Sequence, residues 1–332
     1  MNPNAFASSR HSRTRAGLRA WLAALAAAVL VASCGGGDTV DPFEPSRMLV
    51  FGDEHSVITA DGRKYGINDL DAAGAVACAG NPNWVQEVAR NLGLVFAECR
   101  SDDRAATALM RAAAGARSAD AQAAIDAYLA ADAPASKDLV TVMVGMHDVL
   151  ELYAAYAARG EAALVADLEA RGRALARTLN RVATGGPVVL VFTVPDLGLT
   201  PYALVEKAAH IDTDRAALLT RLSEAFNRGL RLEVINDGRL IGMVFADEQL
   251  QLMVRYPGSF GLRNVTAAAC ANAATPPETS PAALLACTNA AGALVGDATD
   301  STWLWADTLR LGPTGQARLG LVALSRVRNN PF

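Results

Sequence analysis

Short runs of apolar residues alternate with longer amphipathic segments along this chain, and that alternation is what most limits its fold. The apolar runs lie at 48–51, 94–96, 139–144, 188–194 and 241–245, and the amphipathic segments lie at 84–92, 105–130, 161–183 and 214–235. Continuous apolar runs predict buried strands, and strands separated by helices usually pair in parallel. We therefore predict an α/β fold: a three-layer α/β/α sandwich around a parallel sheet of about five strands.

Length and charge limit the domain organisation and the partners. A chain of 332 residues with 52% hydrophobic content can bury about 70–75% of its unfolded surface. No repeat or internal linker interrupts residues 47–332, so we predict one domain there, with loops over 257–301 before a closing helix in "GPTGQARLGLVALSRV". The net charge of −4 leaves no basic excess to neutralise phosphates, which excludes nucleic acid as the expected partner.

The first residues form a targeting segment. Residues 1–33 combine an Arg-rich start with an apolar run at 21–31 that is too short to span a bilayer, and "VASC" ends at Cys34. The pattern resembles a bacterial lipoprotein signal, which implies cleavage before Cys34 and lipidation of that residue, followed by a flexible tether over 34–46. We expect the protein in the cell envelope, anchored by its lipid to the outer membrane because Gly35 follows the cysteine. An ordinary signal peptide with an incidental cysteine is the alternative.

Export leaves four cysteines in an oxidising compartment if Cys34 is lipidated. Three pairings are possible, and we favour the two local ones, Cys78 with Cys99 and Cys270 with Cys287, because each closes a loop-rich stretch. A metal site is disfavoured, since no cysteine pair has close ligand spacing and no histidine lies nearby. We predict neither a metal nor a cofactor.

Four segments are expected at the carboxyl ends of the strands, where parallel sheets bind their ligands. They read "GDEHS" after the first strand, "AAAGARSAD" around Gly115, "VGMHDVLELY" and "WLWADTLRLGPTGQ". With "TVPDLGLTP" and "FGLRNVTAAAC", these blocks resemble, in order, those of the SGNH or GDSL family of esterases and lipases. The resemblance implies a flavodoxin-like SGNH hydrolase fold and an ester-hydrolase site.

The residues that name this family are mostly replaced here. Glu54 stands where the family has its nucleophilic serine, His147 where it has the oxyanion-hole asparagine, and Arg310 where it has the general-base histidine. Gly115 matches the block whose backbone N–H completes the oxyanion hole. The remaining matched positions are Asp53, Gly145, Asp148 and Asp307.

These replacements remove the expected chemistry. Acyl transfer needs a nucleophile beside a base and donors around the developing oxyanion, and an arginine stays protonated and cannot serve as the base. We therefore predict that Glu54 neutralises Arg310 across a former active site, with His147 beside them. We expect His55 to face solvent, Asp307 to hold the final loop, and Trp303 and Trp305 to belong to the core.

Two classes of function follow from this interpretation. The first is a lipid-anchored envelope protein without esterase turnover, with a binding or structural role toward a small molecule or an envelope glycan or lipid. The alternative is a carboxylic ester hydrolase, an esterase, lipase or glycan acetylesterase, that uses a rearranged site with Glu54 and His147. The fold alone cannot separate the two, because function depends on the site.

Overall fold

The computed structural model describes residues 42–332 except 101, 132–133, 274–281 and 331. The expected signal peptide, Cys34 and most of the expected tether lie outside the described residues. Five strands form one parallel sheet in the order β2-β1-β3-β4-β5. Their bounds are β1 Arg47–Gly52, β2 Ala108–Met110, β3 Asp138–Met143, β4 Val188–Phe192 and β5 Ile241–Val244.

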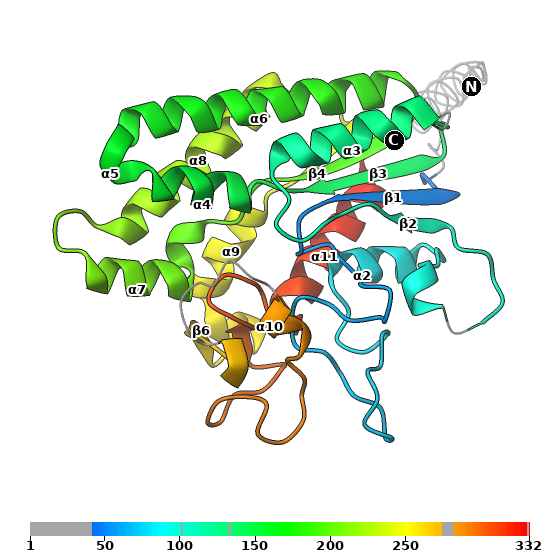
Figure 1. The fold of residues 1–332 in the computed structure, drawn as a ribbon. Coiled ribbons are helices and arrows are strands. Elements are labelled where there is room, and N and C mark those ends of the chain that lie inside the picture. Colours follow the sequence, from blue (N-terminus) through cyan, green and yellow to red (C-terminus); the bar gives the residue numbers. More distant parts are fainter. Residues whose placement is uncertain (1–41, 101, 132–133, 274–281, 331) are drawn as a thin grey trace, which may run out of the picture. The chain divides into compact units, whose positions relative to one another are not determined.

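Helices cover both faces of this sheet, which confirms the predicted three-layer α/β/α fold (Figure 1). One core lies beneath α3 (Ser118–Ala131), α4 (Met146–Ala154), α6 (Glu161–Thr184) and α8 (Arg215–Glu233); the other lies beneath α2 (Trp84–Asn91), α9 (Ala246–Arg255) and α11 (Pro313–Asn329). The shorter helices are α5 (Tyr156–Arg159), α7 (Pro201–Ala209) and α10 (Ala282–Leu285).

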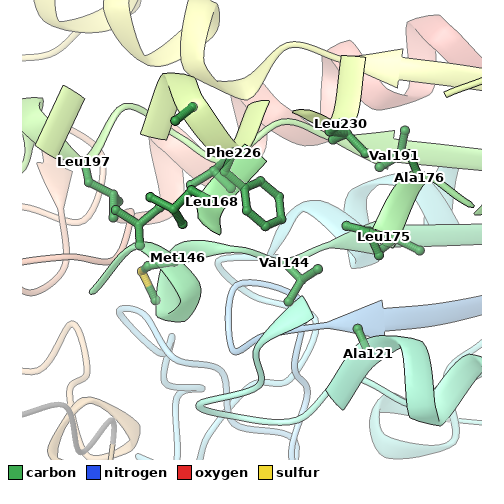
Figure 2. Close-up of a cluster of buried hydrophobic side chains, with 14 of the residues drawn as sticks. Ala121, Val144, Met146, Leu168, Leu175, Ala176, Val191, Leu197, Phe226 and Leu230 are labelled. Carbon is green, nitrogen blue, oxygen red and sulfur yellow. The ribbon is translucent and has the colours of Figure 1, made fainter. Parts of the chain in front are cut away.

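The pair α6 and α8 covers its face of the sheet through an unusually close contact. A Cβ atom at Gly172 of α6 would lie 2.2 Å from the carbonyl oxygen of Phe226, and one at Gly229 of α8 would lie 2.1 Å from that of Glu169. Glycine at both positions therefore lets the backbones approach. Apolar side chains of the two helices then belong to one buried cluster (Figure 2). It includes Phe226 and Leu230 of α8 and Leu168, Leu175 and Ala176 of α6.

Two predicted elements differ in the structure. The second strand is Ala108–Met110 rather than 94–96, where Phe96 makes only an isolated bridge to Ala108. Accordingly, the helix predicted over 105–130 begins only at Ser118. The Ala-rich stretch favours a helix locally, but parallel pairing with β1 over Met48–Val50 places it in the sheet, because tertiary pairing overrides propensity.

The folded unit begins before residue 47. Pro45 is buried, and the ring of Phe43 packs edge-on against that of Phe332 at 5.6 Å between centroids. The last residues of the predicted tether thus pack against the domain. The C-terminal residue meets them at the edge of the sheet where the strands begin, which we call the amino edge.

Two disulfides hold the loop-rich regions, and they are the two local pairings favoured from the sequence: Cys78–Cys99 and Cys270–Cys287. The second lies in a small core beside the two-stranded sheet of β6 (Asn264–Ala268) and β7 (Trp303–Trp305). Trp303 and Trp305 are both buried there, as predicted for core residues. The segment that contains Arg310 follows directly after β7.

Candidate functional site

The residues matched to the ester-hydrolase blocks meet at the carboxyl ends of the strands. β1 leads into Glu54, and β3 leads into His147 at the start of α4. Each turn needs glycine: Gly52 has φ +132° with Met143 oxygen 1.9 Å from its would-be Cβ, and Gly145 has φ +128° with Val194 Cγ2 at 2.4 Å. Glycine tolerates both the positive φ and the close approach.

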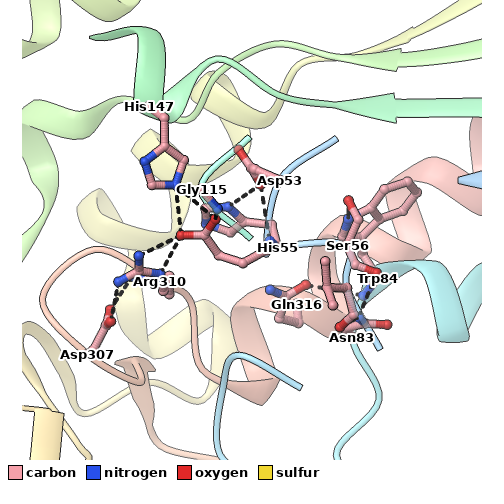
Figure 3. Close-up of polar contacts among 12 residues, drawn as sticks. Asp53, His55, Ser56, Asn83, Trp84, Gly115, His147, Asp307, Arg310 and Gln316 are labelled. Atoms are coloured by element: carbon pink, nitrogen blue, oxygen red, sulfur yellow. Dashed lines mark hydrogen bonds and ion pairs between the residues drawn. The ribbon is translucent and has the colours of Figure 1, made fainter. Parts of the chain in front are cut away.

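Three of the matched positions converge on the buried carboxylate of a fourth, Glu54 (Figure 3). The Glu54 side chain is 0% exposed. Its Oε1 accepts hydrogen bonds from Arg310 Nε at 2.8 Å and Nη2 at 2.5 Å, and its Oε2 accepts one from the backbone N–H of Gly115 at 2.9 Å. His147 Nε2 lies 2.8 Å from Oε2 and 2.9 Å from Oε1. Both oxygens of Glu54 are therefore fully engaged.

Asp307 fixes Arg310 from the other side. Its Oδ2 accepts from Arg310 Nη1 at 2.7 Å, while its Oδ1 accepts from the backbone N–H groups of Leu309 at 2.8 Å and Arg310 at 2.5 Å. Arg310 is 1% exposed. A guanidinium held between two carboxylates, each through hydrogen bonds, is a well-satisfied buried charge. With His147 protonated, these four side chains sum to zero charge.

Burial and pairing act in opposite directions on the protons of this cluster. Burial alone would raise the pKa of Glu54, but the hydrogen bond from His147 and the charge of Arg310 outweigh it and hold that pKa below its ordinary value. Burial alone would lower the pKa of His147, but its bond to the Glu54 carboxylate and the charge of that group raise it. Glu54 is thus ionised, and His147 favours the imidazolium form.

The same contacts predict how stability depends on pH. Glu54 contributes stability above its unfolded pKa of 4.5, which is lost as pH falls through its lower folded pKa; His147 contributes fully below its unfolded pKa of 6.5, and this is lost as pH rises through its raised folded pKa. The pair is therefore most stabilising between pH 4.5 and 6.5.

The variant His147→Gln tests the pH range in which this pair stabilises the fold, because glutamine does not titrate. We expect the wild type to lose unfolding free energy above neutral pH that the variant does not lose, because the raised pKa of His147 ties part of the stability to its protonated form. Urea unfolding at a series of pH values measures both profiles. Equal losses in the two proteins would contradict the assignment of this pH dependence to His147.

The prediction for His55 is wrong. It is only 2% exposed, and its Nδ1 and backbone nitrogen lie 3.0 and 3.1 Å from Asp53 Oδ1. Asp53 therefore closes the turn after β1, with the carbonyl of Asp53 also accepting from Ser56 N at 3.0 Å. The sequence does contain a signal for this turn. An Asp side chain often accepts a hydrogen bond from the backbone N–H two residues later, as Asp53 does from His55.

Asp148 also holds structure and does not join the Glu54 cluster. Its carboxylate accepts from Ser118 N at 2.7 Å and Ser118 Oγ at 2.8 Å, and from Arg171 Nη1 at 3.1 Å. It thus ties the first residue of α3 to α4. Ser56, the nearest hydroxyl in the turn sequence, accepts from Trp84 Nε1 at 3.2 Å.

A small cavity adjoins Glu54. It has a volume of about 10 Å³ and is lined by Glu54, His55, Tyr65 and the buried Lys64 among others, and a volume of this size is about enough for one water molecule. Lys64 Nζ donates to the carbonyls of Cys78 at 2.9 Å and Gly80 at 2.6 Å, and burial lowers its pKa to about 8. Sequence reasoning missed Lys64 and Tyr65 as neighbours of this site.

The described part of the chain contains no group of three or more His, Cys, Asp or Glu side chains placed to hold a metal ion. Nor does any helix in the described ranges have the length and apolarity to cross a membrane.

Comparison with known proteins places the chain in a family. No curated protein matches it. Similar solved structures include a variant acetyl xylan esterase from Geobacillus stearothermophilus, with 16% identity over 73% of this chain and 91% of that one and a TM-score of 0.37. They also include an α/β hydrolase from the metagenome of Lake Arreo, Spain, with 18% identity over 62% and 81% and a TM-score of 0.36. The family model of GDSL-like lipases and acylhydrolases matches residues 49–251, more than half of the sequence, and the chain therefore belongs to the GDSL-like lipase/acylhydrolase family.

Proposed function

We propose that this chain is a lipid-anchored protein of the cell envelope that keeps the GDSL-family fold without ester turnover and has a binding or structural role. The observation that carries the proposal is the position of the Glu54 carboxylate. It accepts the Gly115 N–H and the Arg310 guanidinium at once, and the cavity that adjoins it has room for about one water.

The Glu54 carboxylate occupies the nucleophile position and binds the groups at the base and oxyanion-hole positions, all of which acyl transfer would need. By the family resemblance, Glu54 stands at the nucleophile, Arg310 at the base, and the Gly115 N–H at the oxyanion hole. Arg310 cannot accept a proton, and the charges of Asp307 and Glu54 raise its pKa further even though burial opposes this. A substrate carbonyl would have to displace an anion already bound by three donors.

The alternative, an ester hydrolase that uses Glu54 and His147, rests on one contact. His147 Nε2 lies 2.8 Å from Glu54 Oε2, and the His147 side chain is 11% exposed. Such a pair is within reach for proton transfer. We favour the non-catalytic function because a nucleophilic or basic Glu54 would first have to leave Arg310.

An ester screen on the purified mature protein separates the two functions. We expect no hydrolysis of short-chain esters, long-chain esters or acetylated glycans above the buffer rate, for the wild type and for Glu54→Gln and His147→Gln alike. Circular dichroism of each variant establishes that it is folded. Hydrolysis by the wild type that disappears in Glu54→Gln would make Glu54 catalytic and overturn the proposal.

The anchoring part of the proposal rests on the N-terminal sequence. The segment ending in "VASC" resembles a lipoprotein signal, and acylation of Cys34 by several chains would hold the protein stably at a membrane. The outer membrane is the proposed location, on its periplasmic or outer surface.

A further inference from the structure

The outer edge of β5 carries a groove that the Glu54 site does not use. Its volume is about 610 Å³, and its apolar lining includes Leu232, Ile235, Met243 and Phe245. Leu232, at the end of α8, is 70% exposed. We call this feature the edge groove. Leu232 therefore adds an exposed apolar side chain to the lining of this groove.

Cations surround the edge groove and the start of the sheet. The Arg326 guanidinium lines the groove and lies 5.9 Å from the ring centroid of Phe245. Arg328, in the same last turn of α11, donates to the carbonyl of Asn91 at 3.2 Å. Lys137 is exposed, with its backbone oxygen bonded to Ser46 N at 2.9 Å.

These three cations have no carboxylate partner within the described residues, whereas Arg231 and Arg239 nearby pair with Asp247 at 2.6 Å and Asp237 at 2.8 Å. Two exposed carboxylates offset two of them: Glu44, and Glu248, which lies 3.7 Å from Arg231 as a second acidic partner. The surface formed by Lys137, Leu232, Arg326, Arg328 and the edge groove is termed the amino-edge surface. It combines surplus positive charge with an exposed apolar side chain.

The described part of the chain begins close to this surface. Phe43 packs on Phe332, and the Phe332 ring lies 2.9 Å from where a Cβ would stand on Gly242 of β5. Only eight residue steps separate Cys34 from Pro42, and eight steps span at most about 29 Å at full extension. A bilayer holding Cys34 therefore lies within that distance of the point where the chain enters the fold.

We propose that the amino-edge surface binds the anionic phospholipid headgroups of the membrane that holds the anchor, so that the Glu54 site faces away from the bilayer. This orientation rests on the proposed lipid anchoring. Lys137, Arg326 and Arg328 would contact phosphates, and Leu232 would enter the interface, because basic residues and apolar side chains together favour anionic membranes.

Fluorescence quenching in vesicles tests the orientation on the full lipidated protein. A fluorophore is attached at Leu232→Cys or, as the matched control, at Ile211→Cys. Ile211 is also a fully exposed aliphatic residue, but it lies before the other end of α8, which at 1.5 Å per residue places it roughly 25 Å or more from Leu232. Vesicles contain phosphatidylethanolamine and phosphatidylglycerol, with a nitroxide on a fraction of the headgroups.

We expect several-fold stronger quenching at position 232 than at 211. The charge reversals Arg326→Glu with Arg328→Glu should bring the two positions close to equal, as should vesicles of phosphatidylcholine alone. The control reversals are Arg117→Glu, just before α3, with Arg159→Glu in α5, both at the other end of the sheet, and they should leave the difference unchanged.

Flotation separates the two proposals. The wild type should float with the vesicles, and Cys34→Ser, which cannot be lipidated, should be largely released. Flotation of the wild type with equal quenching at 232 and 211 would overturn the orientation alone. A wild type that does not float, or floats no better than Cys34→Ser, would overturn the anchoring and the orientation with it.

Discussion

Glu54→Ala is expected to lower the free energy of unfolding by about 3–5 kcal/mol, the range for removing one partner of a buried ion pair. The reason is the environment of Arg310, which is 1% exposed and donates two of its hydrogen bonds to Glu54. Without that carboxylate, the Nε and Nη2 groups lose their acceptor far from solvent. Gly115 is exposed, so water can replace Glu54 at its N–H.

The double change Glu54→Ala with Arg310→Met should be less destabilising than Glu54→Ala alone. Methionine fills much of the arginine volume without a charge. The Asp307 carboxylate would still accept hydrogen bonds from the backbone N–H groups of residues 309 and 310. Urea unfolding of the four proteins completes the double-mutant cycle. Glu151→Ala, which removes a partly exposed carboxylate, is the control and should change stability by about 0.5 kcal/mol or less. Additive effects of the two changes would show that Glu54 and Arg310 are not coupled.

The triple change Glu54→Ser, His147→Asn and Arg310→His is expected to create ester hydrolysis at least about tenfold above the wild-type background, since nucleophile, base and oxyanion donors act as one unit. The distances support this result, because Glu54 oxygens lie within 2.9 Å of groups on Arg310, His147 and Gly115. Asp307 already contacts the residue at 310 and could orient an imidazole there.

Stopped-flow hydrolysis of an activated acetyl ester measures the gain, and labelling of the introduced serine by a phosphonate tests whether it is nucleophilic. The matched control carries only His147→Asn and Arg310→His and should show neither. A folded triple variant without activity or labelling would indicate that the scaffold has changed beyond the three replaced side chains.

The sequence predicted those parts of the structure that depend on continuous patterns. Buried apolar runs located four of the five strands, and the order of the blocks placed Glu54, His147 and Arg310 at one end of the sheet. Residues 108–110 were missed because three residues in an Ala-rich stretch carry no strand signal of their own; pairing with β1 decides their state. His55 was missed because its burial depends on how the turn folds back against Asp53. The block around Gly115 located this glycine, but the bond from its N–H to Glu54 was not predicted, because it depends on how the Glu54 side chain is placed.

The ion pair between Glu54 and Arg310 joins positions 256 residues apart in the chain. During synthesis, which runs from the N-terminus, Glu54 has no guanidinium partner until the segment between β7 and α11 has emerged. Contacts of such long sequence separation form late and depend on nearly complete chains. A chain that stops before Arg310 would keep the Glu54 carboxylate at the end of β1 without its guanidinium partner. The cluster thus couples the electrostatic balance at the end of β1 to synthesis of the segment that carries Arg310.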